Sequence, residues 1–458
     1  MNCSFATVLS ALLLATTTFT NAKLAAEETP AKNGQELTPL GAQRHGNSEG
    51  TIPDWEGGLK GPVPGYVPGE RHVDPFSEDA ILLTINAGNQ HTYADNLTEG
   101  QKALLTLHPD SWHMNVYTSR RTAAYPDFVY DALATNASNS VLITEGRGGV
   151  ENSLVTSPFP RPTQGVEVVW NHNLRWRGIH VTRVDGMAAV TRRGNYTMIL
   201  QDEEWAIPYA RPRAAEAPAP FPNLLLAYKQ KVIAPGFITG NGALALDSLN
   251  HNKARRETWL YSPDLRRVLR APFSGHDNPM LNSDALRFND EGDMFNGSPA
   301  LFDWTLLGKR EIYIPYNAYR LHSGQLKADD ILGEKHINPE HARYELHRVW
   351  VVEGKLKTGD DARDHKYSRR IMYVDEDSWQ IAAVDNYDED GELWRVSEGH
   401  AITYYEVPVP WYTLRVYYDL KQKRYLVNGL DNQRRAPLFD EDINPRLFGP
   451  NALDFYVR

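Results

Sequence analysis

The sequence predicts a mainly β protein with helices (α+β), built on one large antiparallel sheet. Two observations predict this fold class. The last third of the chain, 344–432, is a near-continuous series of aromatic β-strand patterns. Short acidic or glycine-containing segments such as 375–377 and 388–391 separate these strands, and such segments are typical of hairpin turns. Strand 344–352 is apolar on both faces, so we expect both faces of the sheet to be covered.

The start of the chain is typical of an exported protein. The first 22 residues carry no charged side chain and end in Thr20-Asn21-Ala22 before Lys23, which is the pattern of a signal peptide cleaved near Ala22. Cys3 is the only cysteine and leaves with the signal, so the mature chain has no disulfide and no cysteine-based metal site. We therefore expect a protein of a Gram-negative periplasm, soluble or peripherally associated with the outer membrane.

An extended arm is expected next, over 23–75, because this segment is rich in Gly, Pro and polar residues. Two helices follow. Segment 96–108 has capping residues at its start and Pro109 after its end, and segment 126–137 begins with a first-turn proline. We assign 76–458 to a single large domain.

Strand patterns dominate from residue 166 onward, and 211–222 interrupts them as a Pro/Ala-rich loop. Residues 273–303 form a long polar loop, and loops of that length are often functional or act as lids. The expected strands are 166–170, 179–184, 188–192, 196–205, 224–232, 243–249, 255–261, 267–270, 305–314, 344–352, 368–374, 378–384, 392–396, 401–407, 413–418 and 424–427.

Composition narrows the class of partner. The formal net charge of −10 argues against nucleic acid. The 11 Trp and 23 Tyr suit sheets and the walls of apolar clefts. No cofactor is expected.

Two short motifs match known patterns only in part. Residues 46–50 read G-x-S-x-G, but a nucleophile elbow needs a strand before it and a helix after it, and this match lies in the arm. Residues 386–391 copy the first half of a calcium loop, but Ser397 stands where the bidentate acid is needed. We interpret the first as a coincidence and the second as an acidic hairpin turn.

Histidines and acids are densest at His336, Glu340, His341, Glu345 and His347. Glu345 and His347 would share a strand face, but no metal-binding spacing occurs. Ordinary surface or core histidines are the favoured interpretation, and no metal site is expected.

Several segments resemble one bacterial family. They are 37–41 with 50–55, 99–104, 124–126, 167–172, 293–297, 344–352, 375–379 and 407–412. The family is number 1329 among the domains of unknown function and carries the label of outer-membrane lipoprotein-sorting protein. It is remotely similar to the LolA/LolB lipoprotein carriers, so the resemblance implies a half-barrel, a strongly curved sheet with helices packed on its concave side. It also implies a periplasmic carrier or chaperone in an envelope relay, with an RND-type exporter and an outer-membrane-associated protein as partners.

We interpret the chain as a non-enzymatic carrier of a lipid-like or acylated ligand. Each methylene group of an acyl chain that is buried in an apolar cavity contributes about 0.8 kcal/mol to the free energy of binding. The expected cavity wall comprises Trp259, Tyr261, Trp350, Val352, Met372, Val374, Leu414 and Val416. One alternative is an envelope enzyme acting on lipid or glycan, with His276 and Asp277 or the 336–347 cluster as its polar centre. Another is a scaffold that docks onto an outer-membrane partner without a ligand.

Overall fold

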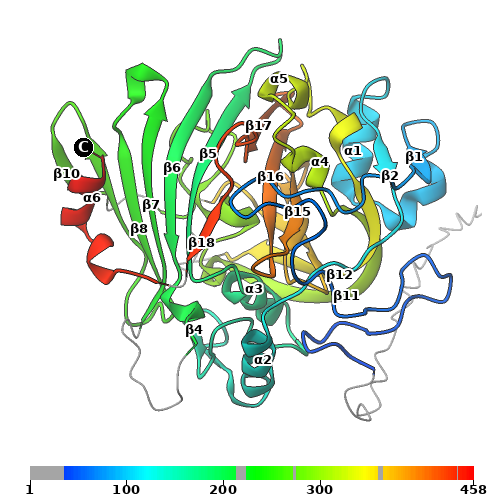
Figure 1. Cartoon of the computed structure of the whole chain (residues 1–458), viewed down its shortest axis with the longest axis horizontal. Helices are drawn as coiled ribbons and strands as arrows, with labels where there is room; N and C mark the ends of the chain where they lie inside the picture. The colour runs from blue at the N-terminus through cyan, green and yellow to red at the C-terminus, as the bar shows by residue number, and fades with distance from the viewer. Residues whose placement is uncertain (1–35, 213–222, 272–274, 359–364, 441, 458) are drawn as a thin grey trace, which may run out of the picture.

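The structure, a computed structural model, describes residues 36–212, 223–271, 275–358, 365–440 and 442–457 (Figure 1). The predicted signal peptide lies outside these residues. The strands are β1 (Leu83–Ile85), β2 (Met114–Val116), β3 (Val141–Ile143), β4 (Gly149–Glu151), β5 (His180–Val190), β6 (Met198–Ala206), β7 (Leu224–Ala234), β8 (Gly242–Ser248), β9 (Glu257–Ser262), β10 (Arg267–Arg270), β11 (Phe302–Pro315), β12 (Tyr344–Leu356), β13 (Arg369–Asp375), β14 (Ile381–Tyr387), β15 (Leu393–Tyr404), β16 (Val409–Asp419), β17 (Arg424–Asn428) and β18 (Leu438–Asp440).

Helices are short and lie between or beside the strands. The α-helices are α1 (Glu99–Leu107), α2 (Asp127–Asn139), α3 (Gly165–Leu174), α4 (Tyr319–His322), α5 (Ala328–Ile331) and α6 (Pro450–Val457). The 3-10 helices are η1 (Gln90–Asn96), η2 (Pro208–Ala210), η3 (Gly236–Ile238), η4 (Asn289–Met294), η5 (Pro299–Leu301), η6 (Pro339–His341) and η7 (Pro445–Leu447). None of the helices in the described part of the chain is long and apolar enough to cross a membrane.

One 16-stranded sheet dominates the molecule, which confirms the predicted mainly β fold with helices. Its main path runs β1-β2-β12-β13-β14-β15-β16-β17-β5-β6-β7-β8-β9-β10, while β11 pairs with β12 and β18 with β5. The strands β12 to β17 pair in chain order as antiparallel hairpins, and acidic turns connect most of them. The predicted breaks at 397–400 and 185–187 are wrong, because 393–404 and 180–190 form the continuous strands β15 and β5. The edge strands β1 and β10 do not pair with each other in the described residues, so the sheet stays open.

Strand register assigns each side chain to a face, because directly paired residues point the same way. Met372 pairs in succession with Val384, Ser397, Tyr417, Leu426 and Ala189, and Ala189 shares its face with Val181, the partner of Trp205. Figure 1 shows that the sheet is curved, and we call the side that carries Met372 and Trp205 the inner face.

Helix α3 and the loop containing η4 cover the inner face. His172 of α3 lies 3.0 Å from the carbonyl oxygen of Trp379 and 3.0 Å from that of Asp293 in the loop. The opposite, outer face carries α1, whose Gly100 N–H donates to the Asp385 carboxylate. Helix α6 packs on the outer face near β8, where Leu453 is fully buried. Both faces are thus covered, as the two-sided apolar strands predict.

The predicted strand 166–170 is wrong, because these residues form α3. Nine of its ten residues are buried, so the segment lacks the one-sided apolar pattern of an amphipathic helix and reads as a β-branched strand. The helix start is set by a capping box, in which the Glu167 carboxylate accepts from the Gln164 N–H at 3.1 Å. The predicted helices near 96–108 and 126–137 are confirmed as α1 and α2.

The described part of the arm lies along the body (Figure 1). The N–H of Leu59 donates to the Thr122 carbonyl, and the N–H of Gly61 donates to that of Tyr405. Trp55 packs edge-on against Tyr130 at 6.5 Å. The arm is therefore attached by backbone hydrogen bonds as well as by aromatic contacts.

Candidate functional site

A cavity of about 610 Å³ lies where α3, the strands β7 to β9 and the loop 275–301 meet. This volume falls in the range of small-molecule sites, about 300–1,000 Å³. Its lining includes the cations Arg147, Arg255, Arg256, Arg270 and Lys357, the acids Asp247, Glu257 and Asp277, the imidazoles His251 and His276, and the apolar residues Trp170, Leu225 and Leu301.

The cavity lining contains more cationic than acidic side chains, although four of its five cations pair with carboxylates. Five cationic side chains face three carboxylates in its lining, whereas the whole chain has a formal charge of −10. Arg147 and Arg255 are exposed, and Arg255 forms no ion pair within the described residues. Such guanidinium groups recognise carboxylates and phosphates by paired hydrogen bonds. The cavity mouth therefore favours an anionic group.

The buried part of the cavity lining is mixed, because the apolar Trp170 and Leu225 lie in it together with the polar Asn173, Asp247 and Ser248. Trp170 of α3 is 1% exposed and Leu225 of β7 is 4% exposed, and both belong to the main hydrophobic core. The Trp170 Nε1–H donates to the Gly146 carbonyl at 2.8 Å, which fixes the indole against this wall. The cavity thus combines exposed cationic side chains with two buried apolar side chains, an arrangement that suits an amphiphilic ligand.

Arg256 organises the polar wall. It forms a two-pronged ion pair with Asp247 and donates to the Asn296 carbonyl at 2.8 Å. Burial opposes ionisation of Asp247, but the Arg256 charge more than offsets it and lowers the pKa of Asp247. His276 lies 3.2 Å from Arg256, and burial together with that charge lowers the pKa of His276 to about 3. His276 is therefore neutral at physiological pH.

Asp293 fixes the loop that forms one cavity wall. The carboxylate is fully buried, pairs with Arg175 and Arg177 of the α3 region, and accepts from Trp411 Nε1–H at 2.7 Å. Burial opposes its ionisation, but the two guanidiniums hold the pKa of Asp293 well below its usual value. Its φ of 53° is the left-handed conformation that Asp tolerates better than most residues. Asn296, next to it in the loop, reaches the cavity from this anchor.

This anchor unites segments that are distant in the sequence. Helix α3 contains 167–172, the loop contains 293–297, and β16 begins within 407–412. The Trp379 carbonyl, from segment 375–379, contacts His172. Four of the family-like segments therefore meet around Asp293.

The eight expected wall residues divide between the two faces. Register places Trp350, Val352, Met372 and Val374 on the inner face, and Trp259, Tyr261, Leu414 and Val416 on the outer face. Val352, Met372, Val374, Leu414 and Val416 are at most 1% exposed in the packed main core. Tyr261 and the half-buried Trp259 pack with α6. None of the eight lines the 610 Å³ cavity.

The two polar centres expected for an enzyme differ in whether their residues come together in the structure. His276 and Asp277 do meet in the cavity. The 336–347 cluster is dispersed: Ser111 Oγ contacts His336 at 2.9 Å, whereas Glu345 contacts His347 at 3.1 Å. The acidic segment 386–391 forms the expected turn between β14 and β15. The cavity arginines were not anticipated, although the basic run 253–256 precedes β9 and is visible in the sequence.

The comparisons with known proteins place the chain in a family. Residues 84–454 match the family described as "Protein of unknown function (DUF1329)". An uncharacterized protein of Pseudomonas aeruginosa is 41% identical over 447 residues, which cover 97% of this chain and 96% of the relative. The fold and cavity define a mainly β protein with one open, bent sheet and a ligand-sized cavity. The chain belongs to the DUF1329 family, as its segments predict.

Solved structures resemble the chain at low identity. A domain from Vibrio parahaemolyticus described as an outer membrane lipoprotein-sorting protein has a TM-score of 0.42 and 14% identity, covering 63% of this chain and 98% of that one. A DUF1329 family protein from Desulfovibrio piger has a TM-score of 0.41 and 13% identity, covering 60% and 92%. A LolA superfamily protein from Nitrosomonas europaea has a TM-score of 0.36 and 12% identity, covering 63% and 99%.

Proposed function

We propose that the protein is a non-enzymatic periplasmic carrier or chaperone whose cavity binds the anionic part of a lipid-like or acylated ligand. One observation carries the proposal: the exposed Arg147 and Arg255 line the same cavity as the buried apolar Trp170 and Leu225. A phosphate or carboxylate head group would pair with the guanidiniums, and apolar atoms next to it would contact the two apolar side chains. The expected relay partners, an RND-type exporter and an outer-membrane-associated protein, remain part of this proposal.

The position of the ligand differs from the one expected from the strand patterns. The inner face is packed under α3 and the loop, and the 610 Å³ cavity that we propose as the binding site lies beside this packed core. A bound chain longer than the cavity would have to displace part of the loop 275–301 or α3. The ligand class is thus defined by its charged end and by the apolar atoms nearest to it.

An enzyme built on His276 is the second candidate, because His276 and Asp277 line the same cavity. A general base works best with a pKa near the operating pH. The pKa of His276, lowered to about 3 by burial and by Arg256, makes it a weak base. The carrier is therefore the better-supported function.

Charge reversal at the cavity mouth tests the proposal. The double variant Arg147→Glu/Arg255→Glu changes two exposed side chains, one of them in an exposed pair with Glu145, so the fold should be retained. The matched control Arg266→Glu/Arg267→Glu makes the same charge change on the β9–β10 hairpin, outside the cavity lining. Binding of a fluorescent acyl lipid is measured with phosphatidylglycerol and with phosphatidylcholine as head groups.

We expect the native protein and the control to prefer phosphatidylglycerol. The cavity variant should bind it at least tenfold more weakly, which corresponds to about 1.4 kcal/mol. Equal binding of both head groups, or equal loss in both variants, would contradict the proposal.

A further inference from the structure

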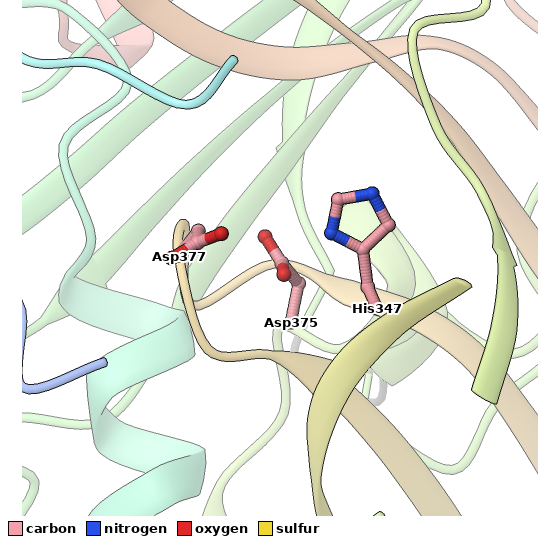
Figure 2. A group of neighbouring side chains, drawn as sticks. All are labelled: His347, Asp375 and Asp377. Atoms are coloured by element: carbon pink, nitrogen blue, oxygen red, sulfur yellow. The ribbon is translucent and has the colours of Figure 1, made fainter. Parts of the chain in front are cut away.

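Three side chains with metal-binding atoms meet outside the cavity, at the end of β13 (Figure 2). They are His347 on β12, Asp375 at the end of β13 and Asp377 in the following turn. Their candidate ligand atoms all lie within 4.8 Å of one another, and the three residues are 1%, 1% and 3% exposed. Figure 2 shows the two carboxylates and one ring nitrogen of His347 turned toward a common point.

The histidine is oriented as metal-binding histidines usually are. His347 Nε2 lies 3.1 Å from the Glu345 carboxylate, and Tyr316 stacks on the ring at 4.0 Å. Glu345 is itself fixed, because it accepts from Arg343 at 2.6 Å and from Asn317 at 3.0 Å. A metal-bound imidazole commonly donates its other N–H to a carboxylate in this way. The other ring nitrogen, Nδ1, then faces Asp375.

Asp375 supplies the second observation. Its Oδ2 accepts from the Ser378 hydroxyl, but its Oδ1 has no hydrogen-bond partner within the described residues, although the side chain is buried. Buried polar atoms without a partner are rare and costly in folded proteins. Asp377 differs, because Arg121 binds it with two hydrogen bonds of 2.7 Å. The unpaired oxygen therefore marks the place where a cation would bind.

We propose that His347, Asp375 and Asp377 bind one divalent first-row transition-metal ion such as Zn²⁺ or Mn²⁺. One imidazole with two carboxylates suits such an ion better than Mg²⁺ or Ca²⁺, which prefer oxygen ligands alone. Ligand atoms at about 2.0–2.2 Å from one ion lie at most about 4.4 Å apart. In tetrahedral geometry the ligand atoms lie about 3.3–3.6 Å apart, so the three side chains, whose ligand atoms lie within 4.8 Å of one another, would close in by up to about 1.5 Å.

The arm seals this site. Arg121 donates to the carbonyls of Gln43 and Arg44, and Arg348 donates to those of Gln43 and His45. These two arginines also pair with Asp377 and Glu376, the residues of the same turn. A metal ion there would connect β12 and the β13–β14 turn beneath the arm, so it would stabilise both. The role we assign to it is structural.

Metal content and affinity test the proposal in the full mature chain. Metal in protein purified without chelators is measured by plasma mass spectrometry. Chelator-treated protein then receives ZnCl₂, MnCl₂ or MgCl₂, both after folding and during refolding, because the arm could slow entry. Binding is followed by calorimetry and by the change in melting temperature. The variants are Asp375→Asn and His347→Gln.

The matched control is Asp385→Asn. Asp385 is also buried on the neighbouring strand, and burial raises its pKa to about 7, but it lies outside the trio. We expect one equivalent of Zn²⁺ or Mn²⁺ in the native protein and in the control, at least tenfold weaker binding in both trio variants, and no comparable binding of Mg²⁺. Absence of a stoichiometric ion by both routes, or equal binding by the trio variants, would overturn the proposal.

Discussion

The buried carboxyl group of Glu398 tests whether side chains on the outer face of the sheet are shielded from water. Its side chain is fully buried on the outer face beneath α1, where it accepts from Tyr344 at 2.9 Å and lies 3.4 Å from Gln101 Nε2. Neither neighbour is charged, so nothing offsets the burial of a carboxylate. Burial therefore raises the pKa of Glu398 from 4.5 to about 7. The substitution Glu398→Gln keeps the shape and the hydrogen-bonding capacity but removes the titration.

The expected size follows from the two pKa values. The folded-state value lies above the unfolded-state value, so the stability contributed by the bound proton is fully present below pH 4.5. It is lost as the pH rises through about 7. At about 1.4 kcal/mol for each pH unit between 4.5 and about 7, the loss amounts to about 3 kcal/mol. The variant does not undergo this loss, so its stability relative to the native protein should rise by about 3 kcal/mol over this range.

Urea unfolding followed by tryptophan fluorescence, at pH values from 4.5 to 8, measures this difference. Asp385 titrates in the same range, but it is present in both proteins and cancels in the comparison. The reasoning is refuted if the free-energy difference between the two proteins stays constant within about 0.5 kcal/mol. Glu398 would then ionise in the folded protein as easily as in the unfolded chain.

Two further substitutions test the packing around the cavity. Val352→Asp places a charge in a fully buried position and should destabilise the fold by at least about 3 kcal/mol, whereas the same change at the exposed Leu265 should be nearly neutral. Thermal melting of the two variants measures the difference. A folded, stable Val352→Asp protein would indicate a hydrated cavity at this position. Asp293→Asn leaves Arg175 and Arg177 without their carboxylate and should lower the free energy of unfolding by about 3–5 kcal/mol. It should also speed proteolysis within 275–301, and unchanged proteolysis would show that this loop is anchored elsewhere.

The sheet was predictable because local patterns determine it. In the meander from Tyr344 onward, strand patterns alternate or are apolar on both faces and most turns are acidic or contain glycine, so neighbours in the sequence become neighbours in the sheet. The misread helix α3 shows the limit of this approach. Its residues Val166, Val168 and Val169 favour strands locally, but the helix is buried on nearly all sides, and tertiary packing overrides that preference.

The candidate site was less predictable because it depends on register and on long-range packing. Leu414 and Val416 alternate cleanly within their own strand, yet only the pairing of Val416 with Glu398 shows that they face away from Met372. The cavity joins a helix near Trp170 to a hairpin near Arg255, across 85 residues of sequence. Sequence spacing contains no sign of this meeting. His347 and Asp375 differ, because their strands are neighbours in the predicted meander and only the register that brings the two side chains together is not given by the sequence.

The measurement that tests the central claim most directly is native mass spectrometry of the protein purified from its own cells, followed by lipid extraction. The account predicts an acidic amphiphile bound to the native protein and to the Arg266→Glu/Arg267→Glu control. It also predicts loss of that adduct from Arg147→Glu/Arg255→Glu, because the cavity cations hold the charged end. A native protein without any adduct, or an adduct that survives reversal of the cavity charges, would contradict the claim.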